Sequence, residues 1–139
     1  MRLVVDANIL FSIMKPDSTV SYLFAQSQLE LFAPEYLKQE LARHKSECIS
    51  KAGLSSHEFE MRLAEIEERV SFFGPPKYKR FLAKSVHALP DPEDSPYLAL
   101  ALALKAGIWT SDPHLRKQSL AKVYSTEDLV RELFKDLVE

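Results

Sequence analysis

Glycine is scarce in this chain of 139 residues, which contains only Gly53, Gly74 and Gly107. The three glycines lie far apart, so they cannot form the phosphate-binding P-loop of an ATPase or the glycine-rich turn of a dinucleotide-binding domain. ATP-driven and NAD-dependent chemistry are therefore excluded.

Cysteine and long apolar runs are also nearly absent. Cys48 is the only cysteine, so the chain has neither an internal disulfide nor a cysteine-rich zinc site and requires no oxidising compartment. The N-terminus offers only the apolar run Leu3–Val5, and the longest such run, Tyr97–Leu104, is much shorter than the roughly 20 residues that cross a bilayer. We expect a cytoplasmic protein with no export signal and no membrane span.

An excess of positive charge is missing as well, because the formal net charge is -2 at pH 7. A protein that holds nucleic acid through a broad basic field has a positive balance, so any contact with nucleic acid must come from local features. The chain is 46% hydrophobic, which is enough for one compact core. We expect a single domain over residues 1–139.

Short apolar runs alternate with amphipathic stretches along the chain. The pattern predicts strands at residues 3–5, 30–33, 70–73, 108–110 and 122–124, and helices at 18–28, 34–50, 55–70, 78–86, 98–104 and from 126 onward. Buried strands that alternate with helices are typical of an α/β fold, in which a parallel sheet is covered on both sides.

Three local signals mark helix ends. Ser55 and Glu58 form a capping-box pattern at the start of one helix. Pro34 is expected to begin the helix at 34–50. Gly107, which follows Lys105, is expected to end the helix at 98–104.

Aspartates follow two of the predicted strands, Asp6 after the first and Asp112 after the fourth. Ligands of an open α/β sheet bind beyond the carboxyl ends of its strands, so the two carboxylates point into one crevice if the strands are neighbours. The alternative is that each aspartate only caps the helix or turn that follows it.

Glu40 lies within an apolar helical stripe that contains Leu37, Leu41, His44 and Cys48 at helical spacing. A glutamate on a face that packs against the core needs a partner, which makes Glu40 a candidate site residue. His44 lies one turn further on and is a candidate neighbour of the site, with a hydrogen-bonded structural role as the alternative.

Asp94 is a third candidate, at the entrance of the buried helix. It shares an acidic turn with Asp91 and Glu93, and Pro96 belongs in the first turn of the helix, so Asp94 or Ser95 is the expected N-cap. Capping is a sufficient explanation for Asp94 taken alone. It does not explain why acids also follow two predicted strands and lie on an inward helical face.

Four acids that converge repel one another unless a cation lies between them. A hard divalent ion such as Mg²⁺ or Mn²⁺ binds carboxylate oxygens, activates water and stabilises charge on phosphoryl oxygens. The pattern therefore predicts phosphodiester hydrolysis, with one or two ions. An aspartate phosphatase is a poor alternative, because Asn8 occupies the place of its second acid, and a receiver domain is equally poor, because Asp6 has no neighbouring acid.

Four ordered motifs resemble those of the PIN-domain family, over nearly the whole chain. They are Leu-Val-Val-Asp-Ala-Asn from Leu3 to Asn8, Tyr-Leu-Lys-Gln-Glu-Leu around Glu40, Asp-Ser-Pro-Tyr-Leu-Ala-Leu-Ala from Asp94, and Trp-Thr-Ser-Asp from Trp109 to Asp112.

The resemblance implies a three-layer α/β/α sandwich with a central parallel sheet and a Mg²⁺- or Mn²⁺-dependent ribonuclease site. Its catalytic and metal-binding acids are then Asp6, Glu40, Asp94 and Asp112, with Asp91 or Glu93 left open as a partner or substitute for Asp94. The polar residues that support the site are then Asn8 and Thr110. Proteins of this size and pattern resemble VapC-like toxins of toxin–antitoxin pairs, which implies a homodimer and a small antitoxin protein as partner.

A basic cluster precedes the acidic turn and is a candidate contact for RNA: Lys77, Lys79, Arg80 and Lys84, with Tyr78 among them. Such residues hold phosphates or stack a base, and the alternative is an ordinary solvated helical face. Two other functions stay open, a PIN fold that only binds RNA or protein and a solitary nuclease of RNA processing.

Overall fold

The structure, a computed structural model, describes residues 1–138, with side chains described up to residue 135. Within this range one sheet is formed by β1 (Arg2–Val5), β2 (Glu30–Pro34), β3 (Val70–Phe73), β4 (Gly107–Trp109) and β5 (Val123–Tyr124). The strand order is β3-β2-β1-β4-β5, and every pairing is parallel. The predicted parallel sheet is confirmed.

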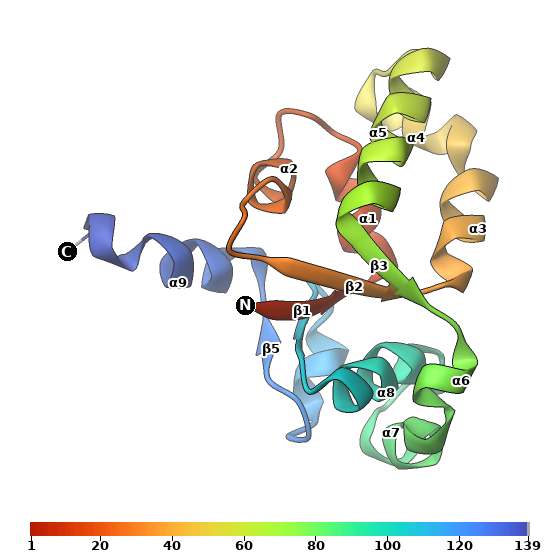
Figure 1. Cartoon of the computed structure of the whole chain (residues 1–139), viewed down its shortest axis with the longest axis vertical. Helices are drawn as coiled ribbons and strands as arrows, with labels where there is room; N and C mark the ends of the chain where they lie inside the picture. Colours follow the sequence, from red (N-terminus) through yellow and green to blue (C-terminus); the bar gives the residue numbers. More distant parts are fainter. Residues whose placement is uncertain (139) are drawn as a thin grey trace.

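Helices cover both faces of the sheet (Figure 1). One face is covered by α1 (Ala7–Ile13), α2 (Thr19–Phe24), α3 (Tyr36–Arg43), α4 (Lys45–Ala52) and α5 (Ser56–Arg69). The other face is covered by α6 (Pro75–Tyr78), α7 (Leu82–Ala88) and α8 (Ser95–Leu104), and α9 (Thr126–Val138) packs beside α2. Short 3-10 helices complete the fold: η1 (Lys79–Phe81), η2 (Pro92–Asp94) and η3 (Pro113–Lys117). The three-layer α/β/α sandwich is confirmed.

The core lies around β1 and α8. Leu3, Val4 and Val5 have no exposed surface, as expected of the central strand of a sheet covered on both sides. The leucines and alanines of α8 are mostly buried, so the prediction of a buried helix rather than a strand is confirmed. No helix within residues 1–138 is both long and apolar enough to span a membrane.

The capping box at Ser55 is confirmed. The Glu58 N–H donates to Ser55 Oγ at 3.1 Å, and the Ser55 N–H donates to Glu58 Oε1 at 2.9 Å. Both interactions join residues only three apart, which is why the sequence alone identifies the start of α5.

The helix predicted at 34–50 is wrong in two respects. Pro34 is the last residue of β2 rather than the first of a helix, and the chain breaks at His44 into α3 and α4. His44 has φ -97° and ψ 22°, outside the helical region, so the apolar stripe of this segment does not continue along one straight helix.

Three other boundaries differ from prediction. The sequence pattern did not indicate α1, which begins directly after Asp6. The helix α2 ends at Phe24 rather than at residue 28. The helix expected at 78–86 is divided into α6, η1 and α7. The Asp6 carboxylate caps α1, so the start of this short helix depends on the same side chain that is a candidate site residue.

The predicted glycine end of α8 is also wrong. Lys105 is the C-cap, in the left-handed conformation with φ 55°, and Gly107 is the first residue of β4. A Cβ atom at Gly107 would lie 3.0 Å from Cε2 of Tyr124, so the absence of a side chain here allows the Tyr124 ring to pack closely against β4.

Substitution of Ser55 by alanine tests the capping box. The variant Ser55→Ala is expected to lower the free energy of unfolding by about 1 kcal/mol, because the Glu58 N–H loses its acceptor. The measurement is urea denaturation at pH 7.5. The matched control is Ser56→Ala, one residue further on, which should not be destabilised, and equal losses in the two variants would contradict a specific capping role.

Candidate active site

Asp6 lies directly after β1 and is 4% exposed. Its Oδ1 accepts a hydrogen bond from the Ile9 N–H at 3.0 Å, and its Oδ2 accepts one from the Thr110 hydroxyl. The carboxylate therefore caps α1 with one oxygen and contacts the end of β4 with the other.

Asp112 lies three residues beyond β4, the strand that neighbours β1. Its Oδ1 accepts from the His114 N–H at 2.9 Å and caps η3. Thr110 joins the two aspartates, because its hydroxyl donates to Asp6 Oδ2 and accepts from the Asp112 N–H at 2.9 Å. The crevice expected at the carboxyl ends of the strands is thus bordered by β1 and β4, where the strand order reverses.

Asp94 precedes the first turn of α8, and its side chain makes no capping hydrogen bond. Asp91 instead caps η2, since its Oδ1 accepts from the Glu93 N–H at 2.9 Å. Burial raises the pKa of Asp94 to about 6, with further contributions from Asp112, Asp91 and Asp6. Asp94 therefore lies close to the other two site aspartates in a partly buried position, while Asp91 and Glu93 are exposed.

The pKa of Asp6 is raised too, above all by burial and in part by Asp112. Hydrogen bonds from Thr110 and Ile9, and the nearby Asn8 backbone N–H, oppose this rise. His114 opposes the rise in the pKa of Asp94, and its Nδ1 lies 3.2 Å from Oδ1 of Asp112. The three aspartates thus form a region of concentrated negative charge.

Glu40 lies on α3 across a hollow of about 440 Å³ that Asp94 also lines. Its side chain is 30% exposed and forms an ion pair with Arg43 at 3.0 Å, and its Oε2 lies 3.5 Å from His44 Nε2. Glu40 thus faces the same hollow as Asp94 but lies at the edge of the apolar stripe, and its carboxylate contacts two residues that are close to it in the sequence.

Two tyrosines that sequence reasoning missed line this hollow, Tyr36 and Tyr97. Burial raises the pKa of both hydroxyls, and that of Tyr97 lies well above its usual range. Their spacing was an available signal, because Tyr97 follows Asp94 by three residues and Tyr36 precedes Glu40 by four, which places each tyrosine beside an acid on a helical face.

The two predicted supporting residues differ in position. Thr110 is buried and contacts both Asp6 and Asp112. The Asn8 side chain is exposed and lies in a second hollow beside Phe11 and His44, while its backbone N–H faces Asp6.

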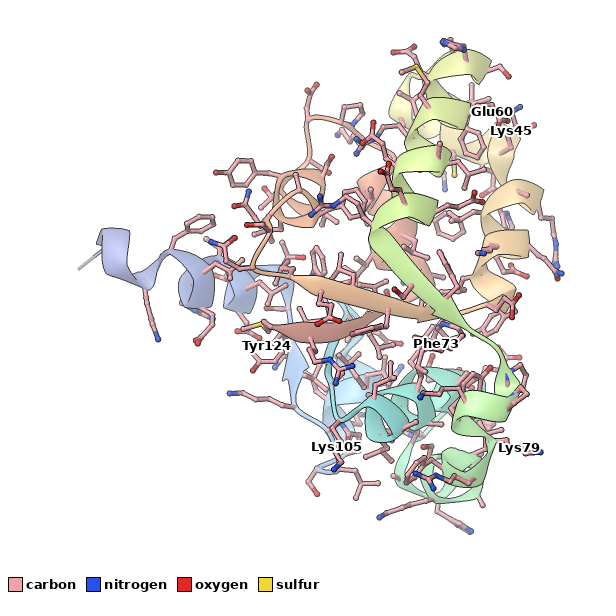
Figure 2. All side chains as sticks on the ribbon, viewed as in Figure 1. Lys45, Glu60, Phe73, Lys79, Lys105 and Tyr124 are labelled. Carbon is pink, nitrogen blue, oxygen red and sulfur yellow. The ribbon has the colours of Figure 1, made fainter. Side chains whose placement is uncertain are left out.

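The basic residues predicted to contact RNA lie on α6 and η1, which pack against α8. Lys77, Lys79 and Arg80 are exposed, and Lys79 projects outward (Figure 2). Lys77 lies over the Phe73 ring at 5.5 Å. Tyr78 is 4% exposed, so it is not available to stack a base.

The site offers oxygen donors to a divalent ion. Within the described residues, no three His, Cys, Asp or Glu side chains gather closely enough to hold a metal directly. Mg²⁺, however, keeps several waters and binds through one or two carboxylates, with others acting through water. Asp94 caps nothing, and Oδ2 of Asp112 makes no hydrogen bond within the part of the chain described. These all-oxygen donors, together with Asp6, fit a hydrated Mg²⁺ or Mn²⁺ ion, and the pKa values of Asp6 and Asp94 are raised.

Removal of the Thr110 hydroxyl tests the link between the strands. Thr110→Val is expected to lower the free energy of unfolding by about 2 kcal/mol, because the buried Asp6 carboxylate and the Asp112 N–H each lose a partner. Urea denaturation at pH 7.5 measures the loss. Thr110→Ser keeps the hydroxyl and should retain most of the stability, and a serine variant as unstable as the valine variant would show that the methyl group matters instead.

Neutralisation of Asp94 tests the concentrated charge. The folded pKa of about 6 exceeds the unfolded value of 3.8, so ionisation of Asp94 destabilises the fold increasingly as the pH rises from 3.8 to about 6. In metal-free buffer at pH 7.5, Asp94→Asn should therefore be more stable than the parent by about 1 kcal/mol after solvent screening, a rise in Tm of about 4 °C. At pH 4 the two should melt alike.

Glu93→Gln is the matched control. It removes the same unit charge from an exposed position one residue before Asp94. It should produce no such rise in Tm at pH 7.5. A rise as large as that of Asp94→Asn would point to net charge rather than to the position of Asp94.

Comparisons with known proteins identify the family and the fold of the chain. The family model described as PIN domain matches residues 4–134. No curated protein matches the chain by sequence. A solved structure with the same fold is a chain of VapBC2 from Rickettsia felis bound to a DNA fragment from their promoter, with a TM-score of 0.66 and 12% identity over 90% of this chain and 98% of that chain. Because the family model spans most of its length, the chain belongs to the PIN-domain family, a family of nucleases.

Proposed function

We propose that this PIN domain is a metal-dependent endoribonuclease that hydrolyses RNA phosphodiester bonds at Asp6, Asp94, Asp112 and Glu40. The observation that supports this most directly is the grouping of three aspartates from β1, β4 and α8 at the point where the strand order reverses. The pKa values of Asp6 and Asp94 are raised mainly by burial and in part by the neighbouring carboxylates, a situation that a bound cation relieves.

The aspartates are the proposed ligands of Mg²⁺ or Mn²⁺. When bound, such an ion supplies Lewis-acid stabilisation of the phosphoryl oxygens and lowers the pKa of a coordinated water. Asp6 is oriented by Ile9 and Thr110, so its position depends little on the ion. Asp94, whose pKa is about 6 without a metal, would bind the ion in its ionised form, so metal binding would release any proton that it still holds.

Glu40 acts from the opposite side of the hollow in this proposal. Its carboxylate contacts His44 and Arg43, and Glu40 lines the hollow that Asp94 also lines. Exposed Lys77, Lys79 and Arg80 are the proposed phosphate contacts for a strand that crosses α8 toward the aspartates.

The biological role that we propose is the toxin of a toxin–antitoxin pair, acting as a homodimer and neutralised by a small antitoxin protein. The shared fold with a chain of VapBC2 supports this role, as do the chain length and motif order. A neighbouring gene for a short DNA-binding protein would support it further, whereas a solitary gene would favour RNA processing.

A binding protein without catalytic activity is the second candidate. It is favoured by one observation: Asp6 and Asp112 already accept helix-capping hydrogen bonds, and Glu40 is already paired. In that case the acids stabilise the fold and no metal binds.

Cleavage of a mixed RNA pool with Mg²⁺ or Mn²⁺ separates the two candidates. The purified protein is expected to cut RNA but not a DNA pool, and EDTA should abolish cutting. Asp6→Asn keeps the shape of the side chain while it removes the charge, and it should reduce the cleavage rate at least about 100-fold.

The matched control is Asp17→Asn, the same chemical change at an exposed position between α1 and α2, which should cut like the parent. If RNA is not cut with either ion and calorimetry detects no Mn²⁺ binding that Asp6→Asn removes, the nuclease proposal is wrong and the binding protein is left.

A further inference from the structure

A second hollow, of about 410 Å³, lies between α1 and α4. These helices are on the same face of the sheet (Figure 1). Two of its lining residues connect it to the site. Asn8 is two residues from Asp6, and His44 pairs with Glu40. The hollow therefore borders the proposed cleavage site without containing any of its four acids.

The wall of this hollow suits a flat apolar group. Phe11 lines it and packs edge-to-face against the His44 ring, with the ring centroids 5.7 Å apart. Cys48 and Ala52 add small apolar surface from α4. Nucleobases of single-stranded RNA stack on aromatic side chains, and a hollow of this size is in the range of pockets that enclose small ligands.

The rim of the hollow suits phosphate. Lys15 and Lys51 are exposed there, and neither has an ion-pair or cation–π partner within the described residues. Lys77 and Arg80 differ from them, because each lies over an aromatic ring of the protein. The lining acid, Glu47, lies 3.7 Å from His44 Nδ1 and forms no ion pair with either lysine.

We propose that this hollow is the subsite for one nucleotide of the RNA strand next to the scissile phosphate, with its base against Phe11 and its phosphates on Lys15 and Lys51. The inference rests on the proposed ribonuclease function and extends it to the recognition of a neighbouring base. A protein segment is the alternative occupant, but two uncompensated lysines beside an aromatic ring favour a nucleotide.

Binding of a labelled single-stranded RNA in EDTA tests the phosphate contacts apart from cleavage. Lys15→Gln combined with Lys51→Gln should weaken binding about tenfold and reduce the slope of log Kd against log salt by about 1.4, the value for two single-strand phosphates. The matched control is Lys105→Gln with Lys135→Gln, which removes the same charge far from the hollow. Lys105 is the C-cap of α8, at the end of this helix opposite Asp94 (Figure 2). The control variant should bind RNA within about twofold of the parent.

The base contact needs a separate variant. Phe11→Leu keeps an apolar side chain against the core but removes the aromatic face. It should weaken binding of a base-bearing oligonucleotide about tenfold and leave binding of an abasic oligonucleotide of the same length unchanged. The abasic strand is the control for loss of folding, which would weaken both.

Three outcomes distinguish the inference from the function on which it rests. RNA binding that is unchanged in all the hollow variants overturns the subsite, even if the parent cleaves RNA, and leaves a protein segment as the occupant. The losses described above, in a parent that cleaves, support both. The same losses in a parent that never cleaves support the nucleotide site and overturn the nuclease.

Discussion

The parallel pairing of β1 with β4 is the constraint on which the site depends. Val5 pairs with Trp109, so the next residue of each strand, Asp6 and Thr110, lie side by side at the carboxyl edge of the sheet. The Thr110 hydroxyl can then donate a hydrogen bond to Asp6 and accept one from the Asp112 N–H. One strand pairing thus positions two of the proposed metal ligands and the turn into η3.

The cost of this arrangement is the burial of acids close to one another. Asp6 is almost fully buried, and its hydrogen bonds with Thr110 and Ile9 only partly offset the loss of hydration. Asp94 is less buried and has no capping bond, so its pKa responds to the neighbouring carboxylates. The capping interpretation and the catalytic interpretation are therefore compatible, since one oxygen of Asp6 and one of Asp112 stabilise helix starts while the same residues concentrate negative charge at the crevice.

Features that depend on nearby residues were predicted well from the sequence. The strands, the buried helix α8 and the capping box of α5 follow from apolar runs and from spacings of three or four residues. The errors occurred where a distant contact changes a local preference. His44 breaks the segment predicted as one helix, and its ring packs against the distant Phe11. Gly107 packs closely against the Tyr124 ring and does not end a helix.

The sequence by itself determined the fold class, the family motifs and the positions of Asp6 and Asp112 after buried strands, because each of these is encoded in a few consecutive residues. Only the tertiary structure decided which polar groups meet. The bond between Thr110 and Asp6 joins residues 104 apart, and no local pattern specifies that β4 lies next to β1. The same holds for the hollow beside the site, where α1 and α4, which lie on the same side of the sheet, bring residues distant in the sequence together.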